Sequence, residues 1–383
     1  MLGESDHSLR KFVAPEFVFG AGASRLAGRY ARNFGVHRVL LVSDPGVASC
    51  PWFDDICRSL DDAGISWAPF SGVSENPRSA EVMRGAEIYE AEECGGIVAV
   101  GGGSPMDCAK GIGIVSSNNQ NILSFEGVDK VRMPGPPLIC IPTTAGSAAD
   151  VSQFAIINDE VQKRKIAIIS KALVPDISLL DPLPLTTLPP EVTVNCGMDV
   201  LSHAIEAYVS NASSPVTDLH ARKAIDLIVR SLPGAVERPD DIDARFATMM
   251  ASLHAGLAFS NASLGAVHAL AHALGGYLDL SHGLANALLL ESVVAFNYAA
   301  APDRYGEIGR IMQAPAGGGK KALVSRIRAF RSSLGIAGTI ADAGCERSDI
   351  PSLAARAIAD PCLATNPKDI TLEDIGRIYE AAF

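Results

Sequence analysis

GIVAVGGGSPMDCAK, residues 96–110, is the stretch of sequence that decides the fold. It begins as a continuous apolar run, passes through three glycines and continues as a helical segment. This order is typical of a buried strand that turns into a helix in an α/β fold. The glycine amides and the positive end of the helix dipole form a place where a phosphate can bind. We expect Ser104 and Asp107 to cap this helix, and we interpret Lys110 as a surface charge.

The neighbouring segments repeat this alternation of strand and helix. Apolar β-rich runs occupy residues 37–44 (HRVLLVSD) and 137–146 (PLICIPTTAG), and residues 79–94 have helical periodicity. Residues 151–170 contain two further β-rich runs that look like a hairpin. Buried apolar strands that alternate with helices predict an α/β domain with a mainly parallel sheet.

The character of the sequence changes at a proline-rich segment, DPLPLTTLPPEV (residues 181–192). After it, β-rich runs almost disappear, and the chain reads as helices rich in alanine and leucine. A chain of 383 residues is also long for one domain. We therefore predict an α/β domain in residues 1–190 and an all-α domain in residues 191–383.

Charge and cysteine content limit the choice of partner and compartment. The formal net charge is -11, which argues against nucleic acid and anionic membranes because both attract basic surfaces. Eight cysteines are scattered and none forms a CxxC pair, which indicates a reduced, cytoplasmic chain. The apolar run at residues 283–296 carries Asn286 and Glu291, so we expect a buried helix there rather than a membrane span.

A second glycine motif, GAGAS at residues 20–24, competes for a phosphate. Arg25 stands where a Rossmann loop needs its third glycine, so a turn into a helix is the other interpretation. Asp44 ends the β-rich run that follows. An acid at this place can accept hydrogen bonds from ribose hydroxyls and repel a 2′-phosphate, which favours NAD over NADP. A loop-capping aspartate would look the same in the sequence.

Five potential metal ligands fall in a short part of the chain. Asp199 and His203 are four residues apart, His268 and His272 are again four apart, and His282 follows. Residues at i and i+4 share one face of a helix, so each pair can point at one spot. A carboxylate with imidazoles suits zinc or iron(II). Spacing alone excludes none of the five.

A metal at this place would support Lewis-acid chemistry. A divalent cation lowers the pKa of an alcohol while a hydride passes to a nicotinamide ring, and an adjacent imidazole can relay the proton. Glu206 could orient one imidazole as a hydrogen-bond acceptor, but we favour a surface or capping acid. His220 and His254 lack a partner at i+4, and we interpret them as structural or solvent-facing.

Several motifs, in order and at matching spacing, resemble the iron-containing (group III) alcohol dehydrogenases over essentially the whole chain. The matching segments are GGGSPMDCAKGI, IPTTAGSAADVSQFAII, GMDVLSHAIEAY, GLAFSNASLGAVHALAHALGGYLDLSHGLANALLL and DPCLATNPKDITLEDIGRIYEAAF. The resemblance implies an N-terminal dinucleotide-binding domain, a helical C-terminal domain and a site in the cleft. It also implies NAD and one divalent metal per subunit, for which iron(II) is favoured and zinc is the alternative.

The resemblance assigns roles to individual residues. It places the metal on four of the five candidates: Asp199, His203, His268 and His282. It leaves His272 beside the metal and near the nicotinamide, as the catalytic residue. Three residues of the segment GGGS at residues 101–104 would hold the pyrophosphate: Gly102, Gly103 and Ser104. Asp44 would lie at the adenosine ribose. The implied contacts along the rest of the cofactor groove are Asn76, Thr143, Thr144, Ser152, Phe154, Lys165 and His272.

We therefore predict an NAD-dependent oxidoreductase that acts on a small primary alcohol or diol, or on its aldehyde. Phe154, Phe259 and Leu264 are expected to shape an apolar substrate pocket. We expect a homodimer or a larger homo-oligomer, because pairing at sheet edges is common in the family. The alternatives are a polyol dehydrogenase of the glycerol type, a dehydroquinate-synthase-like lyase, and a non-catalytic regulator that kept the fold. The lyase needs a cluster of lysine and arginine beside the histidines, and the regulator predicts lost ligands; the sequence shows neither.

Overall fold

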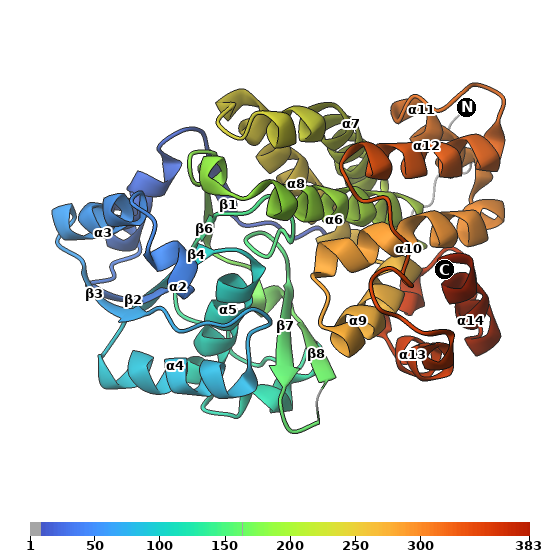
Figure 1. Cartoon of the computed structure of the whole chain (residues 1–383). Helices are drawn as coiled ribbons and strands as arrows, with labels where there is room; N and C mark the ends of the chain where they lie inside the picture. Colours follow the sequence, from blue (N-terminus) through green and yellow to red (C-terminus); the bar gives the residue numbers. More distant parts are fainter. Residues whose placement is uncertain (1–8, 163) are drawn as a thin grey trace.

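In the computed structural model, residues 9–162 and 164–383 are described. Their first half contains a six-stranded sheet in which every neighbouring pair of strands is parallel (Figure 1). The strand order is β1-β9-β6-β4-β2-β3. In chain order the strands are β1 (Glu16–Phe19), β2 (Arg38–Val42), β3 (Ser66–Phe70), β4 (Gly96–Gly101), β6 (Leu138–Pro142) and β9 (Ile177–Leu180). The parallel sheet expected from the alternating segments is confirmed.

Strand β2 shows how helices cover both faces of this sheet. Leu40 and Val42 belong to one buried cluster, together with residues of α4 and α5. Val39 and Leu41 belong to another, together with residues of α1 and α3. Because successive side chains of a strand point to opposite faces, a strand covered on both faces must be apolar throughout. The helices of this half are α1 (Ala27–Asn33), α2 (Pro45–Ala48), α3 (Phe53–Asp62), α4 (Ser79–Ala91) and α5 (Gly103–Asn118).

The strand order creates a switch point between β2 and β4. β3 follows β2 in the chain and pairs with one edge of β2, whereas β4 pairs with the other edge. In open α/β sheets, ligands bind at the carboxyl ends of the strands at such a point. Asp44 follows β2 there, and the glycine loop at residues 101–103 follows β4. The two predicted nucleotide motifs therefore lie at one edge of the sheet.

A second sheet has the order β5-β8-β7 and lies beside the first (Figure 1). β7 and β8 are antiparallel, and β5 pairs parallel with β8. Its strands are β5 (Gly127–Val128), β7 (Phe154–Asp159) and β8 (Arg164–Ile169). This arrangement confirms the hairpin that we expected within residues 151–170.

Helix α5 is tied to this hairpin by Lys110. The side chain is only 2% exposed. Its ammonium group donates to the carbonyl oxygen of Ser152 at 2.9 Å and to that of Phe154 at 2.7 Å. The interpretation of Lys110 as a surface charge is wrong, because backbone carbonyls replace water around the buried cation.

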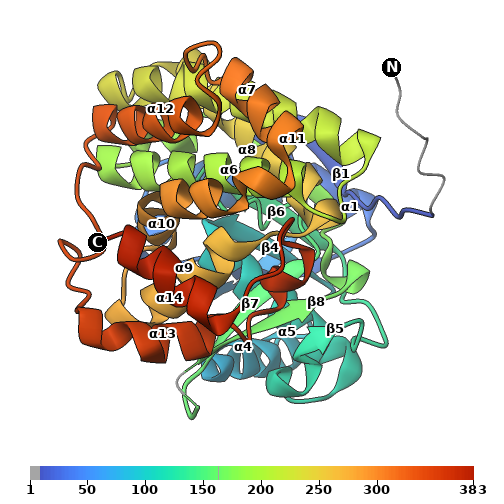
Figure 2. The ribbon, with the colours of Figure 1, turned by 90° about the vertical axis from the view of Figure 1, so that its right-hand side faces the viewer.

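From residue 190 onward the described chain is helical. In Figure 2, α9, α10, α13 and α14 lie in front of the six-stranded sheet. The helices are α6 (Pro190–Val209), α7 (Pro215–Glu237), α8 (Ile242–Ala262), α9 (Ala266–Leu278), α10 (His282–Asn297), α11 (Pro302–Ile311), α12 (Gly319–Ser333), α13 (Ile350–Ala357) and α14 (Leu372–Ala381). The expected fold class, a parallel α/β part followed by a helical part, is confirmed.

Helix α10 contains the apolar run that we expected to be buried. Among the described residues, one helical segment, 282–300, is long and apolar enough to cross a membrane by length and composition, and 61% of it is buried inside the fold. Buried Glu291 accepts hydrogen bonds from the buried Arg331 and from Arg328, whose side chain is largely exposed. A mostly buried segment with an internal ion pair is typical of a core helix.

Candidate metal and cofactor site

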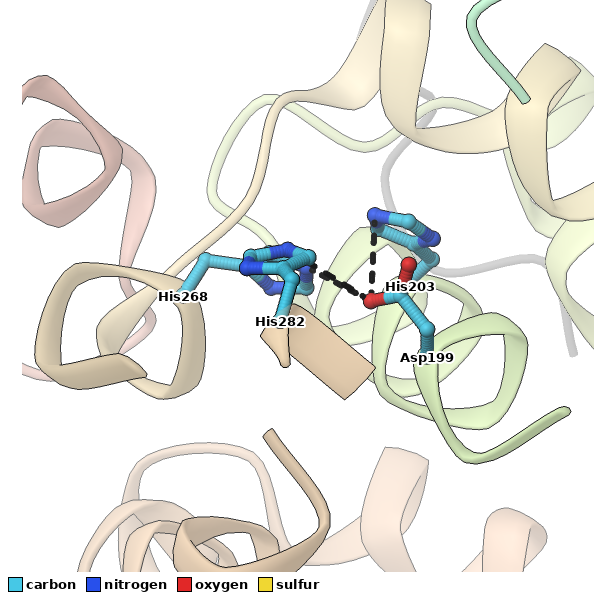
Figure 3. Close-up of side chains that lie close together, drawn as sticks. All are labelled: Asp199, His203, His268 and His282. Atoms are coloured by element: carbon cyan, nitrogen blue, oxygen red, sulfur yellow. Dashed lines mark ion pairs between the residues drawn. The ribbon is translucent and has the colours of Figure 1, made fainter. Parts of the chain in front are cut away.

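Four of the five candidate ligands converge from three helices (Figure 3). Asp199 and His203 lie one turn apart on α6, His268 lies on α9, and His282 begins α10. Oδ1 of Asp199 is 3.7 Å from Nε2 of His203 and 3.6 Å from Nε2 of both His268 and His282. The i, i+4 pair on α6 thus points at one spot, as the spacing predicts.

These four side chains fit a single divalent ion. Ligand atoms at about 2.1 Å from a tetrahedral ion lie about 3.4 Å apart. The separations from Asp199 Oδ1 are close to this value and too long for hydrogen bonds. All four ligand atoms lie within 4.8 Å of one another. The group could therefore hold iron(II) or zinc, both of which accept carboxylate and imidazole ligands.

A close contact between two helices sets the position of His282. Gly283 follows it at the start of α10, and a Cβ atom there would lie 2.0 Å from the carbonyl oxygen of Asn195 on α6. Only glycine allows this approach. The contact brings the first residue of α10 next to the helix that carries Asp199 and His203.

The protonation of the cluster favours a cation. Burial alone would raise the pKa of Asp199, but His203, His282 and His268 outweigh burial and hold the pKa well below its ordinary value. Burial lowers the pKa of His203 to about 3 and the pKa of His282 well below its ordinary value. These rings are neutral near pH 7, as metal ligands must be.

Glu206 contacts the ring of His268, the third proposed ligand, through Nδ1. Burial opposes a charge on His268, yet the carboxylates of Glu206 and Asp199 raise its pKa to about 9. Nδ1 of His268 is hydrogen bonded to Oε2 of Glu206, and Oε1 accepts from the amide of Val267 at 2.6 Å. Glu206 is buried, so the favoured interpretation as a surface or capping acid is wrong. Without a metal, a pKa of about 9 keeps Nε2 of His268 protonated near pH 7. A bound cation would replace that proton, while Glu206 keeps the hydrogen on Nδ1.

Asn286 completes the surroundings of the ligands. Its Nδ2 donates to Oδ1 of Asp199 at 2.7 Å and lies 3.2 Å from Nε2 of His268 and of His282. Asn286 lies one helical turn after His282 and is completely buried. Its hydrogen bond stabilises the carboxylate of Asp199, a role that its place in an apolar run does not reveal.

The fifth candidate, His272, lies beside the cluster rather than in it. Its ring stacks on that of His282 with centroids 5.3 Å apart. Nδ1 of His272 is 2.7 Å from Oδ2 of Asp360. His272 thus has its own partner and lines the cleft next to the four-residue group.

The glycine loop at residues 101–103 forms an uncapped helix start. Gly102 is the N-cap of α5 and supplies no side-chain hydrogen bond. Ser104 Oγ instead accepts from the amide of Asn76, and Asp107 Oδ2 accepts from the amide of Ile156. The expected capping by Ser104 and Asp107 is therefore wrong. The free amides at the helix start remain available to an anion.

The loop at residues 143–147 lies against these glycines. A Cβ atom on Gly102 would meet Thr144 at 3.3 Å, and one on Gly103 would meet Ser147 at 3.0 Å. Thr143 donates its amide to the carbonyl of Gly101 at 2.9 Å. The glycines therefore allow two backbone segments to approach one another at the edge where a pyrophosphate is expected.

Three further predicted cofactor residues, Lys165, Asn76 and Asp44, make local contacts of their own. Lys165 donates to Oδ1 of Asn76 at 2.6 Å. Asp44 accepts from the amide of Val47 at 2.9 Å and caps α2, so one carboxylate oxygen already has a local partner. The glycine motif at residues 20–24 forms a turn into a short 3-10 helix, Ala23–Leu26, as its simpler interpretation predicts.

One cleft of about 710 Å³ connects the helix start to the metal candidates. Gly103 and Ser104 lie along it, and so do the four candidate ligands and His272. The three predicted substrate-pocket residues line it as well: Phe154, Phe259 and Leu264. Phe259 stacks on His203 with centroids 4.3 Å apart and lies 5.9 Å from the ring of Phe154. The members of the predicted cofactor set that line it are Asn76, Gly103, Ser104, Ser152, Phe154, Lys165 and His272.

Comparison with protein families covers almost the whole chain. Residues 14–182 match the model of the iron-containing alcohol dehydrogenases, and residues 193–383 match the C-terminal model of the Fe-containing alcohol dehydrogenase family. The chain belongs to the iron-containing alcohol dehydrogenase family. The family named from the sequence motifs is confirmed.

Individual members of this family align with the chain over nearly its full length. Alcohol dehydrogenase 4 of Schizosaccharomyces pombe is 39% identical over 97% of this chain and 88% of its own. The NAD-dependent methanol dehydrogenase of Bacillus methanolicus is 34% identical over 97% of this chain and 99% of its own. The crystal structure of a 1,3-propanediol oxidoreductase superposes with a TM-score of 0.96, at 36% identity, over 98% of this chain and 100% of that one.

In an iron-containing alcohol dehydrogenase, one end of the cleft suits the cofactor and the other suits the metal. The uncapped start of α5 suits the phosphates of a dinucleotide. The buried carboxylate and imidazoles suit a divalent ion, and iron(II) agrees with the family. Sequence reasoning missed Asp360, which no local motif links to His272. Glu206 did leave a signal, since its i+3 spacing from His203 places it on the same helix.

Proposed function

We propose that this chain interconverts a small primary alcohol or diol and its aldehyde, with NAD and one iron(II) ion. The single observation that carries the proposal is the continuous cleft between the start of α5 and the metal candidates. A phosphate site alone would suit any nucleotide, and a metal site alone would suit many hydrolases. Their joint position brings a hydride acceptor and an activated alcohol together.

The proposed ligands are Asp199, His203, His268 and His282. Iron(II), when bound, acts as a Lewis acid toward the oxygen of the substrate. Glu206 keeps the ring of His268 in the tautomer that presents Nε2. Phe259 covers the ring of His203 and excludes water from it.

The proposed cofactor contacts follow the cleft away from the metal. The glycine loop, through Gly102, Gly103 and Ser104, binds the pyrophosphate, with Thr143 and Thr144 beside it. Asp44 lies at the adenosine ribose, where one carboxylate oxygen remains for hydroxyl groups. The groove is completed by Asn76, Ser152, Phe154 and Lys165. His272 lies near the nicotinamide and acts as the catalytic residue.

The substrate pocket is proposed to be apolar and small. Phe154, Phe259 and Leu264 meet in the cleft next to the ligand cluster. Such a lining favours short uncharged alcohols over highly charged ones. The relatives support this size class, because one is called a methanol dehydrogenase and one structure a 1,3-propanediol oxidoreductase.

We also propose the organisation of the protein in the cell. Residues 1–190 form the dinucleotide-binding domain, and residues 191–383 form the metal-binding domain. β1 lies at the edge of the six-stranded sheet, where a second copy can pair, and we propose a homodimer or a larger homo-oligomer. The scattered free cysteines and the acidic net charge support a cytoplasmic location without nucleic-acid or membrane partners.

A substrate screen tests the function. Purified chain, loaded separately with iron(II) and with zinc, is mixed with NAD and a series of alcohols, or with NADH and the matching aldehydes. We expect NADH formation with short primary alcohols or diols and the higher rate with iron(II). Absence of NAD-linked turnover in both metal forms, across all alcohols and aldehydes, would contradict the proposed function.

A further inference from the structure

His272 is held by a carboxylate that lies far away in the sequence. Asp360 is 88 residues further along, between α13 and the short 3-10 helix η7 (Pro361–Thr365). Its Oδ2 is 2.7 Å from Nδ1 of His272, and its Oδ1 accepts from the amide of Cys362 at 2.8 Å. The Asp360 side chain is 15% exposed and that of His272 is 21% exposed. Each carboxylate oxygen of Asp360 thus accepts one hydrogen bond.

The hydrogen bonds of Asp360 fix the tautomer of His272. Burial raises the pKa of Asp360, but His272 and Cys362 outweigh burial and lower it to about 2. An ionised carboxylate only accepts hydrogen bonds, so Nδ1 of His272 carries the hydrogen. In the neutral ring, Nε2 is then a bare acceptor. The ring also stacks on His282, with an interplanar angle of 18°, which limits its rotation.

We propose that Asp360 is a positioning residue, which holds His272 so that Nε2 accepts a hydrogen bond from a hydroxyl group bound in the cleft. The proposal rests on the proposed function, which supplies two hydroxyl groups, one on the alcohol substrate and one on the ribose of the cofactor. Both offer the same chemistry to Nε2. His272 lines the cleft that would hold both.

The amide variant Asp360→Asn reverses this arrangement without changing the size of the side chain. The amide of Cys362 still needs an acceptor, so the oxygen of the new carboxamide stays on that side. Its NH₂ group then faces His272 and donates to Nδ1. The hydrogen of the ring moves to Nε2, which becomes a donor and no longer accepts a hydroxyl.

The test combines a tautomer readout with kinetics. Wild type and Asp360→Asn are prepared with ¹⁵N-labelled histidine and loaded with zinc, which is diamagnetic. The signal of His272 is identified by its loss in His272→Asn. We expect the Nδ1–H tautomer in wild type and the Nε2–H tautomer in Asp360→Asn. Asp349→Asn serves as the matched control, since this carboxylate accepts from the hydroxyl of Tyr277 at 2.8 Å on the surface.

The kinetic arms identify the hydroxyl group. With the iron(II)-loaded enzyme, we expect Asp360→Asn to weaken one binding step by about tenfold or more, because a donor replaces an acceptor. A higher Kd for NADH points to the ribose, and a lower kcat or a higher KM for the alcohol points to the substrate. Wild-type tautomer and kinetics in Asp360→Asn would overturn the proposal. Failure of the proposed function is distinct, because it appears as an inactive wild type whereas the tautomer of His272 is still measured.

Discussion

Glu206 and His268 form a buried hydrogen bond between Oε2 and Nδ1, directly behind the proposed metal ligand Nε2. The same carboxylate accepts from the amide of Val267 at the start of α9. Glu206 thus orients both the ring of His268 and the helix that carries it. Partners of this kind raise the basicity of a ligand imidazole and hold its geometry.

Glu206→Gln is expected to lower the affinity for iron(II) by about 10- to 100-fold. A neutral carboxamide no longer fixes the Nδ1–H tautomer of His268. The measurement is competition for the metal against a chelator under anaerobic conditions. Glu90→Gln is the control, because Glu90 is an exposed residue of α4. Equal affinity in wild type and Glu206→Gln would show that the carboxylate does not support the ligand.

Gly283→Ala is expected to damage both the fold and the metal site. The new methyl group would meet the backbone of Asn195 at 2.0 Å, so α10 must move and carry His282 with it. We expect a loss of about 1–3 kcal/mol in the free energy of unfolding, measured with denaturant, together with a lower metal content.

The matched control for Gly283→Ala is Gly306→Ala on α11. Nothing lies within 4 Å of a Cβ atom at that position. In a helix interior, alanine is expected to stabilise by about 0.4–1 kcal/mol. If both variants kept full metal content and equal stability, the close approach of α6 and α10 would not set the position of His282.

Phe259→Ala is expected to broaden the range of alcohols. Its ring lines the cleft beside the proposed metal site and contacts His203 and Phe154. Removal of the ring enlarges the pocket, so kcat/KM should rise for longer chains relative to short ones. The measurement is kcat/KM across a series of primary alcohols. An unchanged profile would exclude Phe259 from the substrate pocket.

A histidine pair that does not line the cleft predicts a part of the pH dependence of stability. Nδ1 of His220 lies 2.9 Å from Nδ1 of His254. Burial lowers the pKa of both rings, that of His254 to about 4. The unfolded chain therefore binds more protons between about pH 6.5 and pH 4, so stability is lost as the pH falls through this window.

The variant His254→Gln removes one group of this pair. Its Tm should fall less than that of wild type when the pH is lowered from about 7 to about 5. Histidines elsewhere contribute equally to both proteins, so the difference between them isolates the pair. An equal fall in Tm in wild type and His254→Gln would contradict the claim that the folded protein keeps this histidine pair neutral.

The features that could be predicted from the sequence are those that a local sequence pattern determines. The i, i+4 spacing of Asp199 and His203 and the glycines before α5 are short-range signals, and the structure places both motifs along the cleft. The interpretations that failed concerned the partners of polar side chains: Ser104 and Asp107 bond to other segments instead of capping α5. Lys110 and Glu206 look like surface charges in the sequence. Their partners are the carbonyls of Ser152 and Phe154 and the ring of His268, which only tertiary packing brings close.

Asp360 shows the same limit at the site itself. No periodicity connects it to His272, because the hydrogen bond joins α9 to a loop after α13. Asn286 stands out in the sequence only as a polar residue in an apolar run, although it lies one turn after His282. Metal-ligand spacing could be read from single helices, whereas the residues that orient the ligands could not.

The metal content of the anaerobically purified chain tests the central claim most directly. Wild type is compared with His268→Ala and with His220→Ala, a histidine variant outside the cluster, and folding of each is checked by its Tm. We predict about one divalent ion per chain in wild type and in His220→Ala, and a large loss in a folded His268→Ala. An unchanged metal content in His268→Ala would contradict the assignment of the site.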